Sequence, residues 1–280
     1  LVADDEDDAF FLVQEILSYL PDHNDAEPPH VPTEDPIHRS NDELETLVPD
    51  NPNRPYNMVS VVEEVVDDGE FLELFPNYAE NIIIGFARLD GRSIGVVGNQ
   101  PNVLAGCLDI DASIKAARFI RLCDAFNIPL VTFEDVPGFL PGVVQEWGGI
   151  IRHGAKLLFA YAEATVPKLT LVTRKAYGGA YLAMSCKHLQ SDYNVAWPTA
   201  ELAVMGAEGA VNIIHRREIN AVEDDQKEEV RQRLVEEYKA KFGDPYVAAR
   251  NGWLDDVIEP TESRLRLCRA LAILRSKREW

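Results

Sequence analysis

The chain has 280 residues, of which 46% are hydrophobic, so it can bury a substantial core as one large domain or as one domain with an appendage. Its formal net charge of −20 is local, because residues 1–80 hold 22 acidic and 2 basic residues whereas residues 81–280 hold 25 of each. This distribution excludes the basic footprint of a nucleic-acid-binding protein and argues against a surface that is acidic all over. The acidic segment is best interpreted as a solvated face or a flexible lead-in.

Membrane insertion and redox chemistry are also disfavoured. No apolar run approaches the length needed to cross a bilayer, and the first residues lack the basic region of a signal peptide. The four cysteines are scattered, with no Cys-x-x-Cys pair, which favours reduced structural thiols and no metal site. We therefore expect a soluble cytoplasmic protein without a membrane or nucleic-acid partner.

The N-terminal part predicts one helix and a linker. Apolar residues recur at helical spacing over residues 10–20, and Pro21 ends that helix. Residues 21–56 are rich in proline and acidic residues and poor in periodicity, which is typical of a linker. A helix and a long linker at this position indicate either the end of a preceding domain or a natural N-terminal arm.

The globular part is expected to begin with a short helix and a β-hairpin. Residues 58–66 predict a helix in which Ser60 and Glu63 form a capping box. Residues 81–89 and 92–98 predict two strands joined by an Asp-Gly pair, a strong hairpin signal. We expect the fold to start with this ribbon.

Helices and strands then alternate. In chain order, the patterns predict a helix at 111–126, a buried strand at 128–136, a helix at 145–164, strands at 168–174 and 194–198, and a helix at 208–215. This order implies parallel strands joined by right-handed crossovers, and hence an α/β fold.

Two further helices are predicted near the end of the chain. Residues 222–242 are almost wholly charged apart from one apolar stripe, Val230, Leu234, Val235 and Tyr238. This pattern indicates an amphipathic surface helix that could pack against another subunit. Residues 261–277 predict the last helix, with Thr261 as its cap.

Two glycine-rich loops follow consecutive buried strands. The first is Pro-Gly-Phe-Leu-Pro-Gly at 137–142, and the second is the pair Gly178-Gly179, which joins a strand directly to a predicted helix. Carboxyl ends of parallel strands share one edge of a sheet, where ligands bind. The first N–H groups of a helix have no internal partner and can stabilise an oxygen that gains negative charge. The alternative is that Gly178-Gly179 is only a tight turn.

Catalytic side chains are harder to identify. Glu134 and Asp135 end a strand and Glu146 follows the first loop, so a carboxylate acid–base pair is conceivable. However, adjacent strand residues point to opposite faces, so Glu134 and Asp135 cannot serve one pocket. His153 and His188 lie on predicted helices without the companions of a triad or a metal site.

Longer runs of the sequence carry a family resemblance. They are VGNQP at 97–101, CDAFNIPL at 123–130, DVPGFLPG at 135–142, GGIIRHGAK at 148–156, RKAYGGAY at 174–181, and AWPT at 196–199 through MGAEGA at 205–210. These runs resemble the carboxyltransferase (β) subunits of biotin-dependent acyl-CoA carboxylases, closest to those that act on propionyl-CoA. The related transcarboxylases and sodium-pumping acyl-CoA decarboxylases share the same motifs.

The resemblance implies a crotonase-like (ClpP/crotonase) fold, a ββα superhelix. It assigns residues 36–280 to the C-terminal carboxyltransferase domain, and residues 1–35 to the end of the N-terminal domain plus linker. In the family, the active site forms between the N-terminal domain of one subunit and the C-terminal domain of another, within a hexamer of β subunits. We therefore expect a shortened piece of a longer subunit, inactive alone; a natural split or a non-catalytic assembly half-subunit is the alternative.

The resemblance also implies the reaction. The carboxyl group would move from carboxybiotin, carried on a biotin carboxylase/biotin carboxyl carrier partner, to the α-carbon of a short acyl-CoA, with propionyl-CoA giving methylmalonyl-CoA. The alternatives are a transcarboxylase or a sodium-pumping methylmalonyl-CoA decarboxylase subunit. The compartment would be the cytoplasm, or the mitochondrial matrix in a eukaryote.

The family's functional residues can be carried over to this sequence. A peptide N–H pair that binds the ureido oxygen of biotin falls on Gly179 and Ala180. The other residues expected to contact biotin or substrate are Gly138, Phe139, Gly142, Gly178 and Leu182. Leu182 lies one helical turn beyond Gly179 and should limit acyl-chain length by sterics, unless it is simply a core residue.

Overall fold

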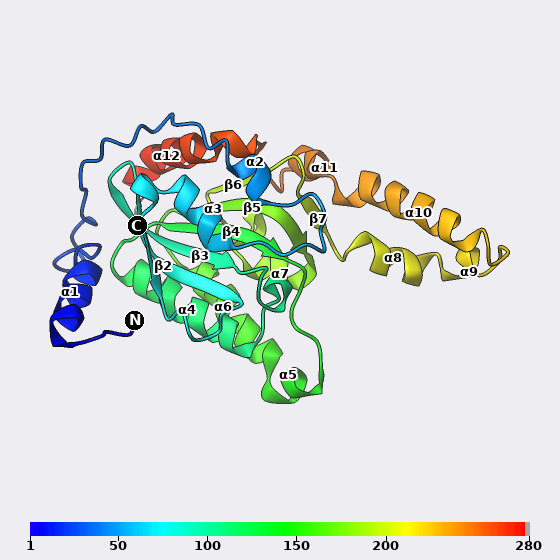
Figure 1. The fold of residues 1–280 in the computed structure, drawn as a ribbon, viewed down its shortest axis with the longest axis horizontal. Coiled ribbons are helices and arrows are strands. Elements are labelled where there is room, and N and C mark those ends of the chain that lie inside the picture. The colour runs from blue at the N-terminus through cyan, green and yellow to red at the C-terminus, as the bar shows by residue number, and fades with distance from the viewer. Residues whose placement is uncertain (278–280) are drawn as a thin grey trace.

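A mixed sheet organises the chain, and the computed structural model describes residues 1–277 (Figure 1). The strands are β1 (Phe71–Leu74), β2 (Ile82–Leu89), β3 (Arg92–Asn99), β4 (Leu130–Val136), β5 (Lys168–Tyr177), β6 (Tyr193–Ala196), β7 (Glu201–Ala203) and β8 (Asp256–Val257). Their spatial order is β1-β2-β3-β4-β5-β6-β8, and β7 pairs with the distal part of β5. The first three strands are antiparallel, and the pairs from β3 onward are parallel, which confirms the predicted α/β class.

Helices cover both faces of the sheet (Figure 1). They are α1 (Glu6–Leu17), α2 (Leu44–Leu47), α3 (Met58–Val65), α4 (Ile110–Ala125), α5 (Val143–Gly148), α6 (Ile150–Glu163), α7 (Gly178–Ala183), α8 (Ala207–Ile214), α9 (Arg216–Ile219), α10 (Lys227–Tyr238), α11 (Pro245–Arg250) and α12 (Ser263–Ile273). The apolar sides of α4, α6 and α7 form one core with the sheet, and those of α3 and α12 form the other. None of the helices within residues 1–277 is long and apolar enough to cross a membrane.

The predicted hairpin is present, but the sheet does not start with it. Asp90 and Gly91 both adopt positive φ angles, 52° and 72°, as a two-residue turn of this kind requires. The sequence does not predict β1, β7 and β8, which are four, three and two residues long. Strands this short carry too few residues for an alternating pattern, and they form because a neighbouring strand offers a free edge.

Several predicted boundaries are wrong. The helix expected at 145–164 is two helices, because Gly149 adopts a left-handed conformation with φ of 89° between α5 and α6. Asn57, rather than a box made by Ser60, caps α3, and its side chain accepts the N–H of Val59. The last helix starts after a 3-10 turn and no side chain caps it, so Thr261 is not its cap.

The segment expected to be a linker is held against the core. The N–H of Val31 donates to the carbonyl of Gly91 at 2.8 Å, and the side chains of Leu44 and Tyr56 are buried. Leu44 and Tyr56 are too far apart in the sequence to produce a periodic signal, although both pack in the same hydrophobic core cluster. We refer to residues 21–56 as the strap.

The apolar stripe of the charged helix α10 packs against other helices of the same chain. Leu234 packs with Val211 of α8 and Ile219 of α9, and these helices form an arm that projects from the sheet (Figure 1). The stripe is therefore confirmed, and within this chain it covers the small core of the arm.

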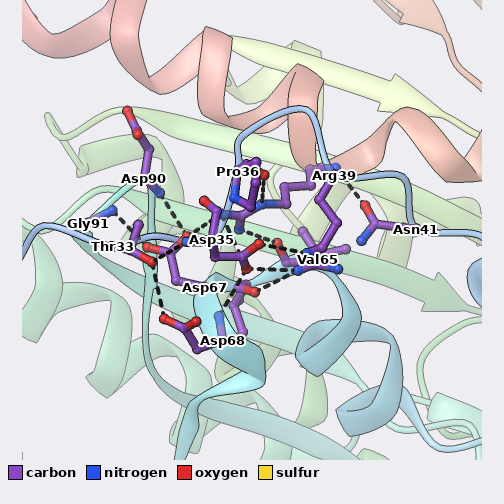
Figure 2. A network of polar contacts seen from close by, with 12 residues as sticks. Thr33, Asp35, Pro36, Arg39, Asn41, Val65, Asp67, Asp68, Asp90 and Gly91 are labelled. Carbon is purple, nitrogen blue, oxygen red and sulfur yellow. Dashed lines mark hydrogen bonds and ion pairs between the residues drawn. The ribbon is translucent and has the colours of Figure 1, made fainter.

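A buried arginine joins four distant segments (Figure 2). Arg264 of α12 is fully buried and donates to Asp67 at 2.7 Å, to the carbonyl of Val65 at 3.0 Å and to the carbonyl of Pro36 at 3.1 Å. Asp67 also accepts the N–H of Gly91 at 2.7 Å. The last helix, the strap, the end of α3 and the hairpin turn thus share one hydrogen-bonded centre.

Replacing Arg264 by Met should lower the free energy of unfolding by about 3–5 kcal/mol, because it leaves a buried carboxylate without its counter-charge. The matched control is Arg266→Met on the same helix, whose pair with Glu262 is partly exposed and should contribute no more than about 1 kcal/mol. Urea unfolding of both variants measures the difference. Equal losses in the two variants would contradict the assignment.

Candidate functional site

The two glycine-rich loops meet at one edge of the sheet. Strands β4 and β5 are parallel neighbours, and Val136 at the end of β4 lies opposite Ala176 of β5. The loop 137–142 follows β4, and α7 follows β5 directly. The prediction that both loops share the carboxyl edge of the sheet is confirmed.

Position 178 requires glycine for two reasons, its backbone conformation and the closeness of Val204. Its φ is 59°, and a Cβ atom there would lie 2.9 Å from the carbonyl oxygen of Val204. That oxygen is brought close because Tyr177 pairs with Ala203 of β7. Any other residue would strain the junction, so this position fixes where α7 begins.

The first turn of α7 presents free N–H donors. Tyr177 precedes the helix and makes no side-chain cap, and among residues 1–277 no acceptor receives the N–H of Gly179 or Ala180. Gly179 is exposed, and a Cβ atom built on it would meet no atom within 4 Å. The N–H of Gly179 therefore borders open space, and the N–H of the buried Ala180 follows it without a partner in the described chain, an arrangement that suits an anion or an oxyanion.

The loop 137–142 has glycine at two positions that border open space. Gly138 and Gly142 have φ angles of 154° and 132°, and a Cβ atom at either would meet nothing within 4 Å. Phe139 has a different position: it is half-buried, and a Cβ atom on Gly154 of α6 would lie 2.8 Å from its ring. The ring thus anchors the loop on α6 while the glycines leave its outer side open.

Leu182 lies one turn beyond Gly179 and is 38% exposed. Val204 and Met205, which follow β7, are 81% and 38% exposed. The exposure of Leu182 disfavours its interpretation as a core residue. The sequence gives no periodic signal for Val204 and Met205, because they belong to a connection whose course depends on β7.

The candidate acidic residues do not form a catalytic pair. Asp135 is buried and ion-paired with Arg174 at 3.0 Å, whereas Glu146 is exposed on α5. Glu134 is completely buried, and within residues 1–277 neither of its carboxylate oxygens has a hydrogen-bond partner. No arrangement of these three groups offers an acid and a base in one open pocket.

Within residues 1–277, neither His153 nor His188 has the partners of a catalytic or metal-binding histidine. His153 lies between Arg152 and Lys156 at 3.3 and 3.5 Å, so its nearest polar partners are cations. His188 packs its ring against the rings of Tyr181 and Trp253. In the described part of the chain, no group of three or more His, Cys, Asp or Glu side chains could hold a metal ion.

Comparison with known proteins identifies the family. The model of the carboxyl transferase domain family matches residues 1–280. The chain belongs to the carboxyl transferase domain family. This carboxyl transferase domain is 55% identical over 276 residues to the propionyl-CoA carboxylase, carboxyltransferase subunit, of Haloferax mediterranei, covering 99% of the chain and 53% of that protein. It is also 55% identical over 267 residues to the methylmalonyl-CoA decarboxylase subunit alpha of Propionigenium modestum, covering 95% of the chain and 51% of that protein.

Solved structures agree with this assignment. A crystal structure of transcarboxylase 12S, a hexamer with methylmalonyl-coenzyme A and methylmalonic acid bound, superposes with a TM-score of 0.95 at 51% identity, over 100% of this chain and 53% of that one. The crotonase-like carboxyltransferase fold is therefore confirmed. This carboxyl transferase domain spans about half the length of the curated relatives that it matches.

Burial at Glu134 has a consequence for stability. Burial raises the pKa of its carboxyl well above the usual value, and the neighbouring Asp135 adds to the effect. The folded state thus keeps a proton that the unfolded chain loses above pH 4.5, its ordinary pKa. Stability contributed by this group is complete below that pH and falls as the pH rises, by up to about 1.4 kcal/mol per pH unit.

The variant Glu134→Gln, which cannot ionise, should therefore be more stable than the natural protein at pH 8, and this advantage should shrink as the pH is lowered towards 4.5. Urea unfolding at several pH values measures it. Glu146→Gln is the control, because it makes the same substitution at an exposed position. An advantage independent of pH would show that Glu134 is ionised in the folded protein.

Proposed function

We propose that the protein is the carboxyltransferase part of a biotin-dependent acyl-CoA carboxylase. It moves a carboxyl group from carboxybiotin to the α-carbon of a short acyl-CoA, with propionyl-CoA as the preferred substrate and methylmalonyl-CoA as the product. The observation that carries this proposal is the N–H pair of Gly179 and Ala180, unpartnered among the described residues, in a chain that is 55% and 54% identical to two propionyl-CoA carboxylase subunits.

The residues at the edge fit the bicyclic head of biotin. Carboxybiotin supplies the carboxyl group, and its transfer leaves negative charge on the ureido oxygen. The N–H groups of Gly179 and Ala180 donate to that oxygen, and they need no reorganisation because the fold already holds them without a partner. The bare glycines 138 and 142 let a flat ring approach the backbone.

Leu182 is proposed as part of the wall that meets the acyl chain. It is partly exposed on the face of α7 that carries Gly179, and it offers volume without a polar group. A steric wall discriminates weakly, by about 1–3 kcal/mol per methylene, so selection of propionyl over acetyl or butyryl chains should be graded.

The described residues form only part of the proposed active site. We assign residues 36–280 to a C-terminal carboxyltransferase domain and residues 1–35 to the end of a preceding domain with its linker. The matching N–H pair for the acyl-CoA thioester would come from the preceding domain of another subunit. This chain alone would then be inactive.

An exposed apolar face supports packing against another domain. Val143, Val144 and Trp147 of α5 and Ile151 of α6 are 64%, 82%, 88% and 87% exposed. Apolar patches of this kind mark interfaces, and we propose a homo-oligomer, such as the hexamer described for transcarboxylase 12S. The other partner is a biotin carboxylase/biotin carboxyl carrier subunit. The compartment is the cytoplasm, or the mitochondrial matrix in a eukaryote; the pig relative is a mitochondrial protein by name.

A methylmalonyl-CoA decarboxylase subunit is the second candidate, because the Propionigenium modestum protein is equally similar at 55% identity. Both functions use carboxyl transfer between biotin and an acyl-CoA, so they differ in partner subunits and not at this edge. Purification of the native complex distinguishes them, since only the carboxylase would bring a biotin carboxylase with it.

The change Gly179→Pro in the full-length protein should lower kcat for carboxyl transfer by about 100- to 1000-fold, because it removes one oxyanion donor. Proline is tolerated in a first helical turn, so the protein should still fold. The matched control is Gly209→Pro, in the first turn of α8, where added atoms also meet open space. A Gly179→Pro enzyme as active as the control would falsify the proposal and favour a non-catalytic assembly subunit.

A further inference from the structure

The strands that carry the two loops change register just before the site. Glu134 of β4 lies opposite Val172 of β5, but the next pair is Val136 with Ala176. Two steps along β4 therefore match four steps along β5. Such a bulge leaves backbone groups of the longer strand without their ladder partners, and it re-aims the strand that contains it.

Asp135 supplies the missing acceptor. Its Oδ1 accepts the backbone N–H of Lys175 at 3.1 Å, and its Oδ2 accepts Nε–H of Arg174 at 3.0 Å. The side chain of Asp135 is only 1% exposed, and the backbone N–H of Asp135 donates to Oδ1 of Asn99 at 3.2 Å. The carboxylate thus binds two consecutive residues of the bulge, while Asn99 holds the backbone that carries it.

The remaining bonds fix the bulge from the outer side. The guanidinium of Arg174 donates to the carbonyl of Arg54 at 2.9 Å and lies over the ring of Tyr56. The hydroxyl of Thr173 donates to the carbonyl of Glu134 at 3.1 Å and bonds the hydroxyl of Tyr56 at 2.9 Å. The end of the strap therefore covers the bulge and binds Thr173 and Arg174.

Only a short rigid connection separates this centre from the N–H donors. After Lys175, residues Ala176 and Tyr177 pair with β7, and Gly178 then starts α7. Ala176 and Tyr177 are fixed by this pairing, and Gly178 is enclosed by the carbonyl of Val204, so a displacement of Lys175 along the strand should move the first turn of α7 by a similar amount.

We propose that Asp135 is a positioning residue for carboxyl transfer, an inference that rests on the proposed function. It does not touch the reacting atoms. Its bond to the backbone N–H of Lys175 fixes the position of the last residues of β5 along the strand direction. It thereby fixes the position of the Gly179 and Ala180 donors relative to the loop 137–142. Catalytic groups misplaced by about 1 Å can lose about 100-fold in rate, so this control is large enough to matter.

The substitution Asp135→Asn tests the inference with little change in shape. Lys175 and Arg174 donate to different oxygens of Asp135, and the amide oxygen replaces only one of them, so the NH₂ group would face a donor in place of the other. In the full-length enzyme, Asp135→Asn should lower kcat by about 100-fold while KM for the acyl-CoA changes by less than about threefold.

The matched control is Asp67→Asn, which also removes a buried carboxylate bound to an arginine and to backbone N–H groups, far from the site. Assayed well below both melting temperatures, it should lose stability but keep the natural kcat. Natural kcat in folded Asp135→Asn, or an equal loss of kcat in Asp67→Asn, would overturn the proposal.

Two further measurements keep the inference testable. Amide hydrogen exchange of the α7 peptide should be faster in Asp135→Asn and unchanged in Asp67→Asn. This measurement does not depend on activity. If the natural enzyme shows no transfer activity, the proposed function fails, but hydrogen exchange still tests whether Asp135 positions α7. If Asp135→Asn does not fold, Tyr56→Phe removes one hydrogen bond from the same bulge and should lower kcat by about fivefold, the equivalent of about 1 kcal/mol. Unchanged kcat in that variant would then reject the proposal.

Discussion

One backbone neighbour determines the candidate site: the carbonyl oxygen of Val204 occupies the space that a Cβ atom on Gly178 would need, at the point where β5 becomes α7. The contact exists because β7 adds to the distal part of β5, beyond the strand order of the main sheet. Glycine alone has both the positive φ and the missing Cβ that this junction requires. The helix therefore starts abruptly, without a cap, and its first N–H groups are left free at the edge where the loop 137–142 also ends.

Buried charges are paired inside the protein. Two buried arginines, Arg264 and Arg174, each bind a buried aspartate and backbone carbonyls of the strap. Part of the acidic excess of residues 1–80 is thus structural, since Asp67 and Asp35 neutralise Arg264. What the edge itself offers is neutral peptide donors and bare glycines, which suits stabilisation of a transient oxyanion better than acid–base or metal chemistry.

The sequence predicted features whose causes are local. The Asp90-Gly91 hairpin, the alternating strands and helices, and the uncapped glycine junction all follow from short patterns, and family resemblance placed the donors on Gly179 and Ala180. Features that depend on distant residues were not predictable. The burial of Tyr56 and the packing of Phe139 on Gly154 each need a partner that is not adjacent in the sequence.

The most direct measurement of biotin recognition is a crystal structure of the full-length protein with biotin bound. The ureido oxygen should lie about 2.7–3.1 Å from the backbone nitrogens of both Gly179 and Ala180, the distance of a working oxyanion donor. A ureido oxygen that points away from this pair, or biotin bound at another edge of the sheet, would contradict the site proposed for this carboxyl transferase domain.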